Sequence, residues 1–270
     1  MRTSMGYVEG KSLLHTLNPL LKLWGLVVVT VSVLISPDWA LNLLVLVCVV
    51  AGFLLSGTRP LLSRRRVLSV LTFSLFLILL QVVITPNGPV LFYVLPGPSL
   101  PVTVPGIERG VIVTTRFLVV ILSSMLFTAV TDPSLLAHSL TRVGVSYRHA
   151  FMLVIALRFL PLFGSENEIV RLAQRSRGIT IQVGSVSKIL RTVRYTFFPL
   201  LVSALNRVEA LSISMDGRGF GRAPTRTYLR QAQWRLRDTL TGVVMTAHLL
   251  IVTLVALGAV PPLSHVIWGD

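Results

Sequence analysis

The sequence predicts an all-α polytopic membrane protein with about five transmembrane helices and two or three long amphipathic coupling helices on the cytoplasmic side. Two observations predict this fold class. The 270-residue chain is 53% apolar, only 13% charged and has a mean hydropathy of +0.78, outside the range of soluble globular domains. Its apolar residues also gather in runs long enough to cross a bilayer, separated by short basic loops.

Five apolar runs predict the transmembrane helices. The first follows Arg2, Lys11 and Lys22 as a secretory signal would, but no small-residue cleavage site comes after it, so we expect it to be retained. Pro37-Asp38 predicts a tight turn after it. The predicted spans are residues 20–36, 39–56, 67–85, 110–130 and 239–260.

The loops between these runs differ in charge. Residues 57–66 form a short basic loop that includes Arg64 to Arg66, whereas residues 86–106 are rich in proline and glycine and predict an irregular or re-entrant outer segment. With the amino terminus inside, 23 of the 25 basic residues fall on the inner side. We therefore expect residues 1–131 to hold four spans, residues 132–238 to be cytoplasmic, and residues 239–270 to hold the last span with the carboxyl terminus outside.

The formal net charge of +15 could indicate nucleic-acid binding. The basic residues lie in loops between apolar runs, however, which is typical of an orientation signal in a lipid bilayer and not of a nucleic-acid surface. The single cysteine, Cys48, lies inside an apolar run, so no disulfide framework or cysteine metal site is available.

The cytoplasmic region 132–238 predicts several helices. Asp132 at an N-cap position and Pro133 at the first helical position predict a helix start. Residues 150–163 are apolar but too few to span, and Pro161 should kink this helix without ending it. Residues 185–216 are amphipathic over about 48 Å. This long helix could transmit force between partners or could simply lie at the membrane interface.

Two of the helical patterns end in Arg-Gly, at Arg177-Gly178 and at Arg218-Gly219. Glycine is the expected residue after a helix end, and arginine there suits the helix dipole, which explains one such ending. Two endings on the same side favour partner binding, because the planar arginine fork fits a carboxylate pocket.

The chemistry of an enzyme or carrier is not evident. Gly10-Lys11-Ser12 lacks the spacing of a phosphate loop, the five histidines lack metal-ligand spacing, and the spans contain no carboxylate pair. We expect no bound cofactor or metal, and any ATP hydrolysis to occur in partner subunits.

Several stretches resemble the transmembrane T component of energy-coupling factor (ECF) vitamin and metal transporters, the family of the cobalt- and biotin-type T subunits. Residues 15–22, His-Thr-Leu-Asn-Pro-Leu-Leu-Lys, resemble its amino-terminal His-x-Leu-Asp-Pro-x-x-Lys. Residues 173–178 and 214–220 resemble its two Ala-Arg-Gly-like motifs. Asn18, Asp216 and Gly217 stand where the family usually has Asp, Glu and Ala or Ser, so the second helix end is expected to be looser.

The resemblance implies a transducer in a bacterial or archaeal inner membrane. Two cytosolic ABC ATPase subunits would each receive one helix end, and a separate small membrane subunit would bind and select the substrate. The implied docking residues are Ser176, Arg177, Gly178, Gly217, Arg218 and Gly219, supported by Gln174, Arg175, Met215, Asp216, Pro161 and Pro199. A conventional ABC permease and a membrane enzyme acting on lipid phosphates remain alternatives.

Overall fold

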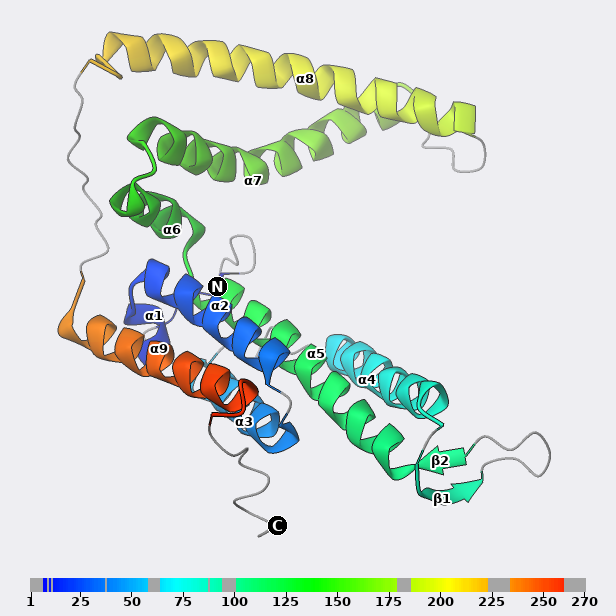
Figure 1. Cartoon of the computed structure of the whole chain (residues 1–270). Coiled ribbons are helices and arrows are strands. Elements are labelled where there is room, and N and C mark those ends of the chain that lie inside the picture. Colours follow the sequence, from blue (N-terminus) through cyan, green and yellow to red (C-terminus); the bar gives the residue numbers. More distant parts are fainter. Residues whose placement is uncertain are drawn as a thin grey trace. The chain divides into compact units, whose positions relative to one another are not determined.

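The apolar runs form helices in a computed structural model that describes residues 7, 8, 10, 12–36, 38–57, 64–86, 88–93, 101–178, 186–222 and 234–259 (Figure 1). The chain divides into two compact units: the bundle unit, Met1–Asp132 with Ala232–Asp270, and the long-helix unit, Pro133–Gln231. The bundle unit contains α1 (Leu13–Thr16), α2 (Pro19–Ile35), α3 (Trp39–Ser56), α4 (Arg64–Ile84), β1 (Val90–Tyr93), β2 (Pro101–Thr103), α5 (Val104–Val130) and α9 (Leu236–Ala256). The long-helix unit contains α6 (Pro133–Leu140), a 3₁₀ turn (Thr141–Val143), α7 (Tyr147–Ser176) and α8 (Val186–Gly217).

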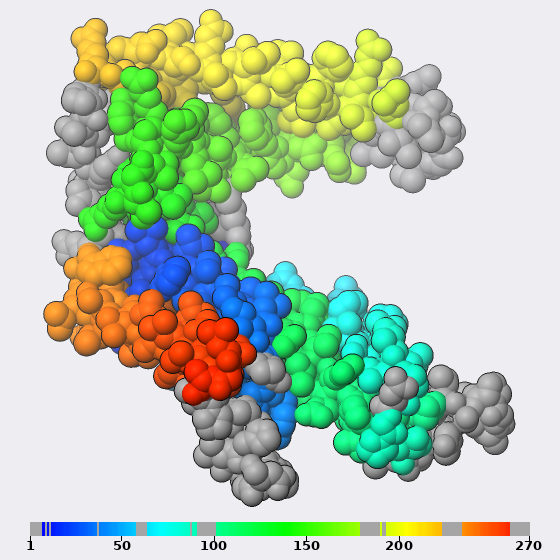
Figure 2. All heavy atoms as spheres, viewed as in Figure 1, coloured from blue at the N-terminus to red at the C-terminus, as the bar shows by residue number. Residues whose placement is uncertain are grey.

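The core of the bundle unit lies between α2, α3, α5 and α9. Leu41, Val45 and Val49 recur every four residues, so they share one face of α3, and all three are buried. This face packs with valines from the other three helices to form one cluster. The cluster consists of Val33, Leu41, Val45, Val49, Val119 and Val252. In Figure 2, α9, in orange and red, lies beside α2, in blue, in agreement with their mutual packing.

The outer faces of these helices are as apolar as the core. Leu55 and Leu44 of α3, for example, are 77% and 57% exposed, whereas the equally apolar Val119 in the core is fully buried. Four helices of the bundle unit, α3, α4, α5 and α9, have mean hydropathies of 2.0 to 2.7 and are long enough to cross a bilayer, while α2 is apolar but slightly shorter. Such outer faces suit contact with lipid. The chain is a multi-pass membrane protein, and the predicted fold class is confirmed.

Three predicted boundaries were wrong. The last span was expected at residues 239–260, but α9 begins at Leu236 and ends at Ala256. Arg64 to Arg66, expected in a loop, form the first turn of α4. The fourth span was expected to begin at Gly110, but α5 begins at Val104. Thr103 caps it, because the Thr103 hydroxyl oxygen accepts a hydrogen bond of 3.2 Å from the Gly106 amide. Proline and glycine that looked like helix breakers therefore stand in its first turn, where proline is tolerated.

The outer segment, predicted to be irregular, contains a short antiparallel hairpin. β1 pairs with β2 so that Val90 faces Thr103 and Tyr93 faces Pro101. The Thr103 hydroxyl also donates a hydrogen bond of 2.8 Å to the Thr85 carbonyl at the end of α4. Thr103 thus links the hairpin, the end of α4 and the start of α5.

Helices α4 and α5 approach closely along a Gly-x-x-x-Gly face that the sequence reading overlooked. A Cβ atom on Gly106 would lie 3.4 Å from the Val82 Cα, and one on Gly110 would lie 3.4 Å from the Ile78 Cα. Small residues at this spacing let two membrane helices pack backbone to backbone. The Phe73 and Phe117 rings, 4.7 Å apart between centroids, extend the same contact.

The long-helix unit agrees closely with the predicted elements. α6 begins at Pro133, and α8 is 32 residues long, shifted by one residue from the predicted range. α7 is a single 30-residue helix that continues through Pro161, with a bend visible in Figure 1. By length and composition α7 and α8 could also cross a membrane, with mean hydropathies of 1.3 and 1.2. Their cytoplasmic location remains a prediction.

Some predicted features lie outside the described residues. These are Lys11 of the Gly-Lys-Ser sequence, Pro37 of the first turn, part of the basic loop at residues 58–63, residues 94–100 of the outer segment, the helix start expected at Ser185, and Pro261-Pro262 after the last span.

Candidate functional site

α7 and α8 pack against each other in antiparallel directions. The Glu166 carboxylate accepts hydrogen bonds from the Ser203 hydroxyl, at 2.6 Å, and from the Arg207 guanidinium, at 3.2 Å. Further along α7, the Gln174 side-chain amide donates to the Tyr195 carbonyl. Residues later in α7 therefore meet residues earlier in α8. The carboxyl-terminal ends of the two helices must then lie at opposite ends of the pair. Because Gln174 lies beside Tyr195, about 25 residues of α8 separate the level of Arg177 from Arg218, which is about 35–40 Å at a rise of 1.5 Å per residue.

The first of these ends, tip 1, comprises residues 174–178. Arg177 is the C-cap of α7, and Gly178 follows it with a φ of 73°. The Gly178 amide donates to the Arg175 carbonyl at 3.0 Å, and the Arg177 amide donates to the Gln174 carbonyl at 3.1 Å. Arg175 to Gly178 are exposed, and Gln174 is half-buried. The glycine thus ends the helix and leaves the arginine facing outward.

The second end, tip 2, comprises residues 215–219 and has the complete Schellman pattern. The Phe220 amide donates to the Met215 carbonyl at 3.0 Å, and the Gly219 amide donates to the Asp216 carbonyl at 2.9 Å. Gly219 has a φ of 67°, which favours glycine. Arg218 is exposed next to it. Both tips therefore present an exposed arginine beside a left-handed glycine.

Aromatic side chains attach tip 2 to the start of α7. The Phe220 ring lies 4.6 Å from the Phe151 ring and 6.0 Å from the Tyr147 ring, measured between centroids. The Tyr147 hydroxyl is buried without a hydrogen-bond partner, and a Cβ on Gly221 would lie 3.8 Å from it. We name Tyr147, Phe151 and Phe220 the aromatic latch. No latch of this kind is seen at tip 1 among the described residues.

The structure divides the predicted site residues between the two tips. Gln174, Arg175, Ser176, Arg177 and Gly178 gather at tip 1, and Met215, Asp216, Gly217, Arg218 and Gly219 gather at tip 2. Pro161 and Pro199 lie inside α7 and α8, exposed and away from either tip.

Sequence reasoning missed the Glu166 contacts and the latch. Tyr147 and Phe151 are spaced by four, which is a helix-face signal, and Phe220 directly follows the second Arg-Gly ending.

Gly217 is the last helical residue of α8, whereas Gly219 is the left-handed residue that terminates the helix. A Cβ on Gly217 would meet nothing within 4 Å, and the φ of Gly217 is not positive. We expect Gly217→Ala to stabilise tip 2 by about 0.5–1 kcal/mol, because alanine has less backbone entropy than glycine in the frayed state of the helix end. Amide hydrogen exchange at residues 213–219 should slow by up to about fivefold.

The matched control is Gly219→Ala. Because Gly219 has a left-handed backbone, this variant should cost about 1–2 kcal/mol and speed up exchange in the same peptide. Equal effects of the two substitutions would contradict the assignment of the helix end.

Metal-ligating side chains do not cluster in the part of the chain that the structure describes: no three of His, Cys, Asp or Glu gather there. In the Gly-Lys-Ser sequence, Ser12 precedes the four-residue α1, and its hydroxyl oxygen lies 2.7 Å from the His15 Nδ1. The tips instead offer exposed cations on rigid helix ends, an arrangement that suits docking of another protein.

Comparisons with known proteins cover nearly the whole chain. A family model described as "Cobalt transport protein" matches residues 10–229. Proteins called energy-coupling factor transporter transmembrane protein EcfT are similar throughout. The one from Leuconostoc gelidum is 32% identical over 91% of this chain and 93% of its own length. That from Listeria innocua is 30% identical over 86% and 90%, and that from Bacillus subtilis 27% over 90% and 95%.

The family match includes the residues that first indicated the resemblance, from His15 to Lys22 through both Arg-Gly endings. The relatives are named as transmembrane components of transporters. The chain therefore belongs to the cobalt transport protein family and is a transmembrane component of the energy-coupling factor type.

Proposed function

We propose that this chain is the transducing subunit of an ECF-type ABC importer. Two cytosolic ATPase subunits dock on it, one at tip 1 and one at tip 2. A separate small membrane subunit binds the substrate, a vitamin or a transition-metal ion. ATP-driven movement of the ATPases displaces α7 and α8 and thereby releases the substrate inward.

The observation that best supports this function is the pair of similar tips at opposite ends of one antiparallel helix pair. Arg177 and Arg218 are both exposed, and each stands beside a glycine with positive φ. Such rigid helix ends suit carboxylate-lined pockets on two partner proteins. A separation of about 35–40 Å leaves room for one globular subunit at each tip.

The faces of α7 and α8 provide a surface for the substrate-binding subunit. Four large apolar side chains lie on the same side of α8 and are between 55% and 59% exposed: Phe197, Phe198, Val202 and Leu205. Figure 2 shows side chains of the later part of α8, in yellow. An apolar surface of this extent is typical of a protein or membrane contact.

The proposed orientation places the amino terminus and residues 132–238 in the cytoplasm and the carboxyl terminus outside. Within the bundle unit, the start of α2, the end of α5 and the start of α9 lie together, so that these three ends share one side of the membrane. The count of basic residues points the same way. Labelling of a cysteine introduced at Ser212 in a Cys48→Ser background tests it: protection in intact cells is expected, and labelling from outside would refute the orientation.

Affinity purification from native membranes tests the function. A tagged chain is expected to recover ABC ATPase subunits, identified by mass spectrometry, together with a small membrane protein, and the complex should hydrolyse ATP. The chain purified alone should not. Turnover of ATP or of a lipid phosphate by the chain alone, or its isolation without ATPases, would refute the proposal.

A further inference from the structure

Three helix ends of the bundle unit meet around Lys22. They are the start of α2, the end of α5 and the start of α9. Asn18 is the N-cap of α2, since its side-chain oxygen accepts a hydrogen bond of 3.0 Å from the Leu20 amide. Lys22 stands one turn further along the same helix. Both residues belong to the stretch 15–22, for which the proposed function has so far given no role.

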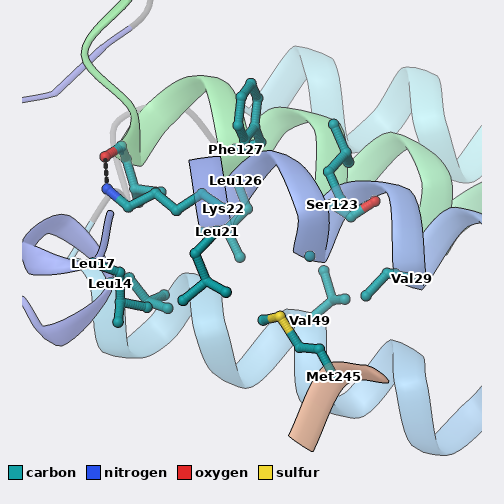
Figure 3. A pocket seen from close by; sticks show the side chains of 13 residues that line it. Leu14, Leu17, Leu21, Lys22, Val29, Val49, Ser123, Leu126, Phe127 and Met245 are labelled. Atoms are coloured by element: carbon teal, nitrogen blue, oxygen red, sulfur yellow. Dashed lines mark hydrogen bonds between the residues drawn. The ribbon is translucent and has the colours of Figure 1, made fainter. Parts of the chain in front are cut away.

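Lys22 joins α2 to the end of α5. Its Nζ donates a hydrogen bond of 2.8 Å to the carbonyl of Val130, the last residue of α5 (Figure 3). It donates a second one, of 3.1 Å, to the His15 carbonyl. The carbonyls of a final helical turn have no partner within their own helix, and a cation is favoured there. The neighbouring Ala129 carbonyl accepts from the Val8 amide at 3.0 Å. Side chain and backbone thus cap α5 together.

Asp238 joins α2 to the start of α9. One carboxylate oxygen accepts from the Asn18 amide at 3.1 Å, and the other accepts from the Arg235 amide at 2.9 Å. Asp238 is 1% exposed and Asn18 is 2% exposed, so these charge-assisted bonds are shielded from water. The carboxylates of Asp238 and Asp132 also attract the Lys22 ammonium group.

His15 completes the group from the side of α1. Burial lowers the pKa of His15, which favours its neutral ring. A neutral ring can donate from Nε2 to the Val8 carbonyl, 3.0 Å away, while Nδ1 accepts from the Ser12 hydroxyl. Lys22 therefore supplies the cation of the group.

The apolar packing beside these contacts is incomplete. An open cavity of about 140 Å³ lies next to Lys22, between leucine and valine side chains of α1, α2, α3 and α5 and Met245 of α9. In Figure 3, Leu21 and Met245 point into it while Lys22 runs along its edge. The polar contacts of Lys22 therefore lie beside a gap in the apolar packing of these helices, where some dispersion contacts are missing.

Both covalent connections to the long-helix unit begin at this group. Val130 precedes Pro133, the first residue of that unit, by three positions, and Asp238 follows Gln231, its last residue, by seven. The chain thus leaves the bundle unit after the end of α5 and re-enters it before the start of α9, and both of these helix ends are hydrogen-bonded to α2.

We propose that Lys22 and Asp238 are positioning residues that tie both connections to α2, so that a displacement of the long-helix unit moves α2, α5 and α9 together. This inference rests on the proposed function. Without the tie, the long-helix unit still responds to the ATPases, but its movement is not passed to the bundle unit.

Hydrogen exchange of the assembled complex tests the tie, with MgATP as the probe. In the wild-type complex, MgATP should change the exchange of peptides from α7 and α8 and of peptides covering residues 18–24 and 234–242. In Lys22→Met, the response of α7 and α8 should persist, while the response of the two bundle peptides should fall about tenfold. Lys22→Arg, which keeps a cationic donor, should restore most of it.

A wild-type response in the bundle peptides of Lys22→Met would overturn the proposal, as would a wild-type complex in which only α7 and α8 respond. If Lys22→Met does not assemble, Asp238→Asn takes its place, because it keeps an acceptor for the Asn18 amide and removes the charge together with the second acceptor, which the Arg235 amide uses. An unchanged response in that variant overturns the proposal equally. Failure of the wild-type chain to recruit ATPases would instead refute the proposed function.

Discussion

Reversing the charge of both tips, with Arg177→Glu and Arg218→Glu in one chain, is expected to abolish recovery of the ATPase subunits. Each substitution places a carboxylate where the partner pocket is expected to be acidic, which typically costs 2–5 kcal/mol or more. Each single variant should then weaken binding by about 100-fold, or about 2.7 kcal/mol. Titration of the purified ATPase subunits against the chain in nanodiscs measures both effects.

The two arginines are suitable for this test because neither supports the fold. Both are exposed at helix ends, so the variants should insert and assemble their helices normally. Arg171→Glu is the matched control: it reverses an exposed charge on α7 less than two turns before tip 1, and should change binding by less than about threefold. Recovery of ATPases by the double variant at the wild-type level would refute docking at the tips.

The spans were predictable because they depend on composition within one segment. Apolar runs located α2, α3, α4, α5 and α9, and Asp132-Pro133 located the start of α6. The errors arose where a contact from elsewhere in the chain decides the local structure. Proline and glycine near residue 105 predicted a loop, whereas the Thr103 cap and its bond to Thr85 make them the first turn of α5.

In the candidate site, too, local patterns were predictable and contacts between distant segments were not. The Arg-Gly endings are local patterns, and the structure places both at helix ends. The aromatic latch joins Phe151 to Phe220 across 69 positions, and the tie around Lys22 joins residues 108 and 220 positions apart. Such contacts depend on how α7 and α8 align and on which helix ends meet, and no local pattern reports either.

Removing the ring of the latch, with Phe220→Ala, is expected to loosen tip 2 and leave tip 1 unchanged. Phe220 follows the left-handed Gly219 and contacts both Phe151 and Tyr147. An aromatic pair of this kind contributes about 0.5–1.5 kcal/mol beyond the burial of its surface. Together with the lost burial of a half-exposed ring, the cost should be about 2 kcal/mol, so amide exchange at residues 215–220 should accelerate about 30-fold.

The loosening should also appear in ATPase binding, because a mobile tip must be ordered before it docks and binding is weakened by that cost. We expect about a tenfold or greater loss in a chain whose tip 1 is blocked by Arg177→Glu, so that only tip 2 is measured. Phe163→Ala is the control, since that ring packs on Phe159 within α7 and is not part of the latch. If Phe220→Ala and Phe163→Ala leave tip 2 equally ordered and equally able to bind, then the Schellman hydrogen bonds alone fix the tip. The difference between the two variants therefore measures how much of the docking strength of tip 2 depends on its attachment to the start of α7.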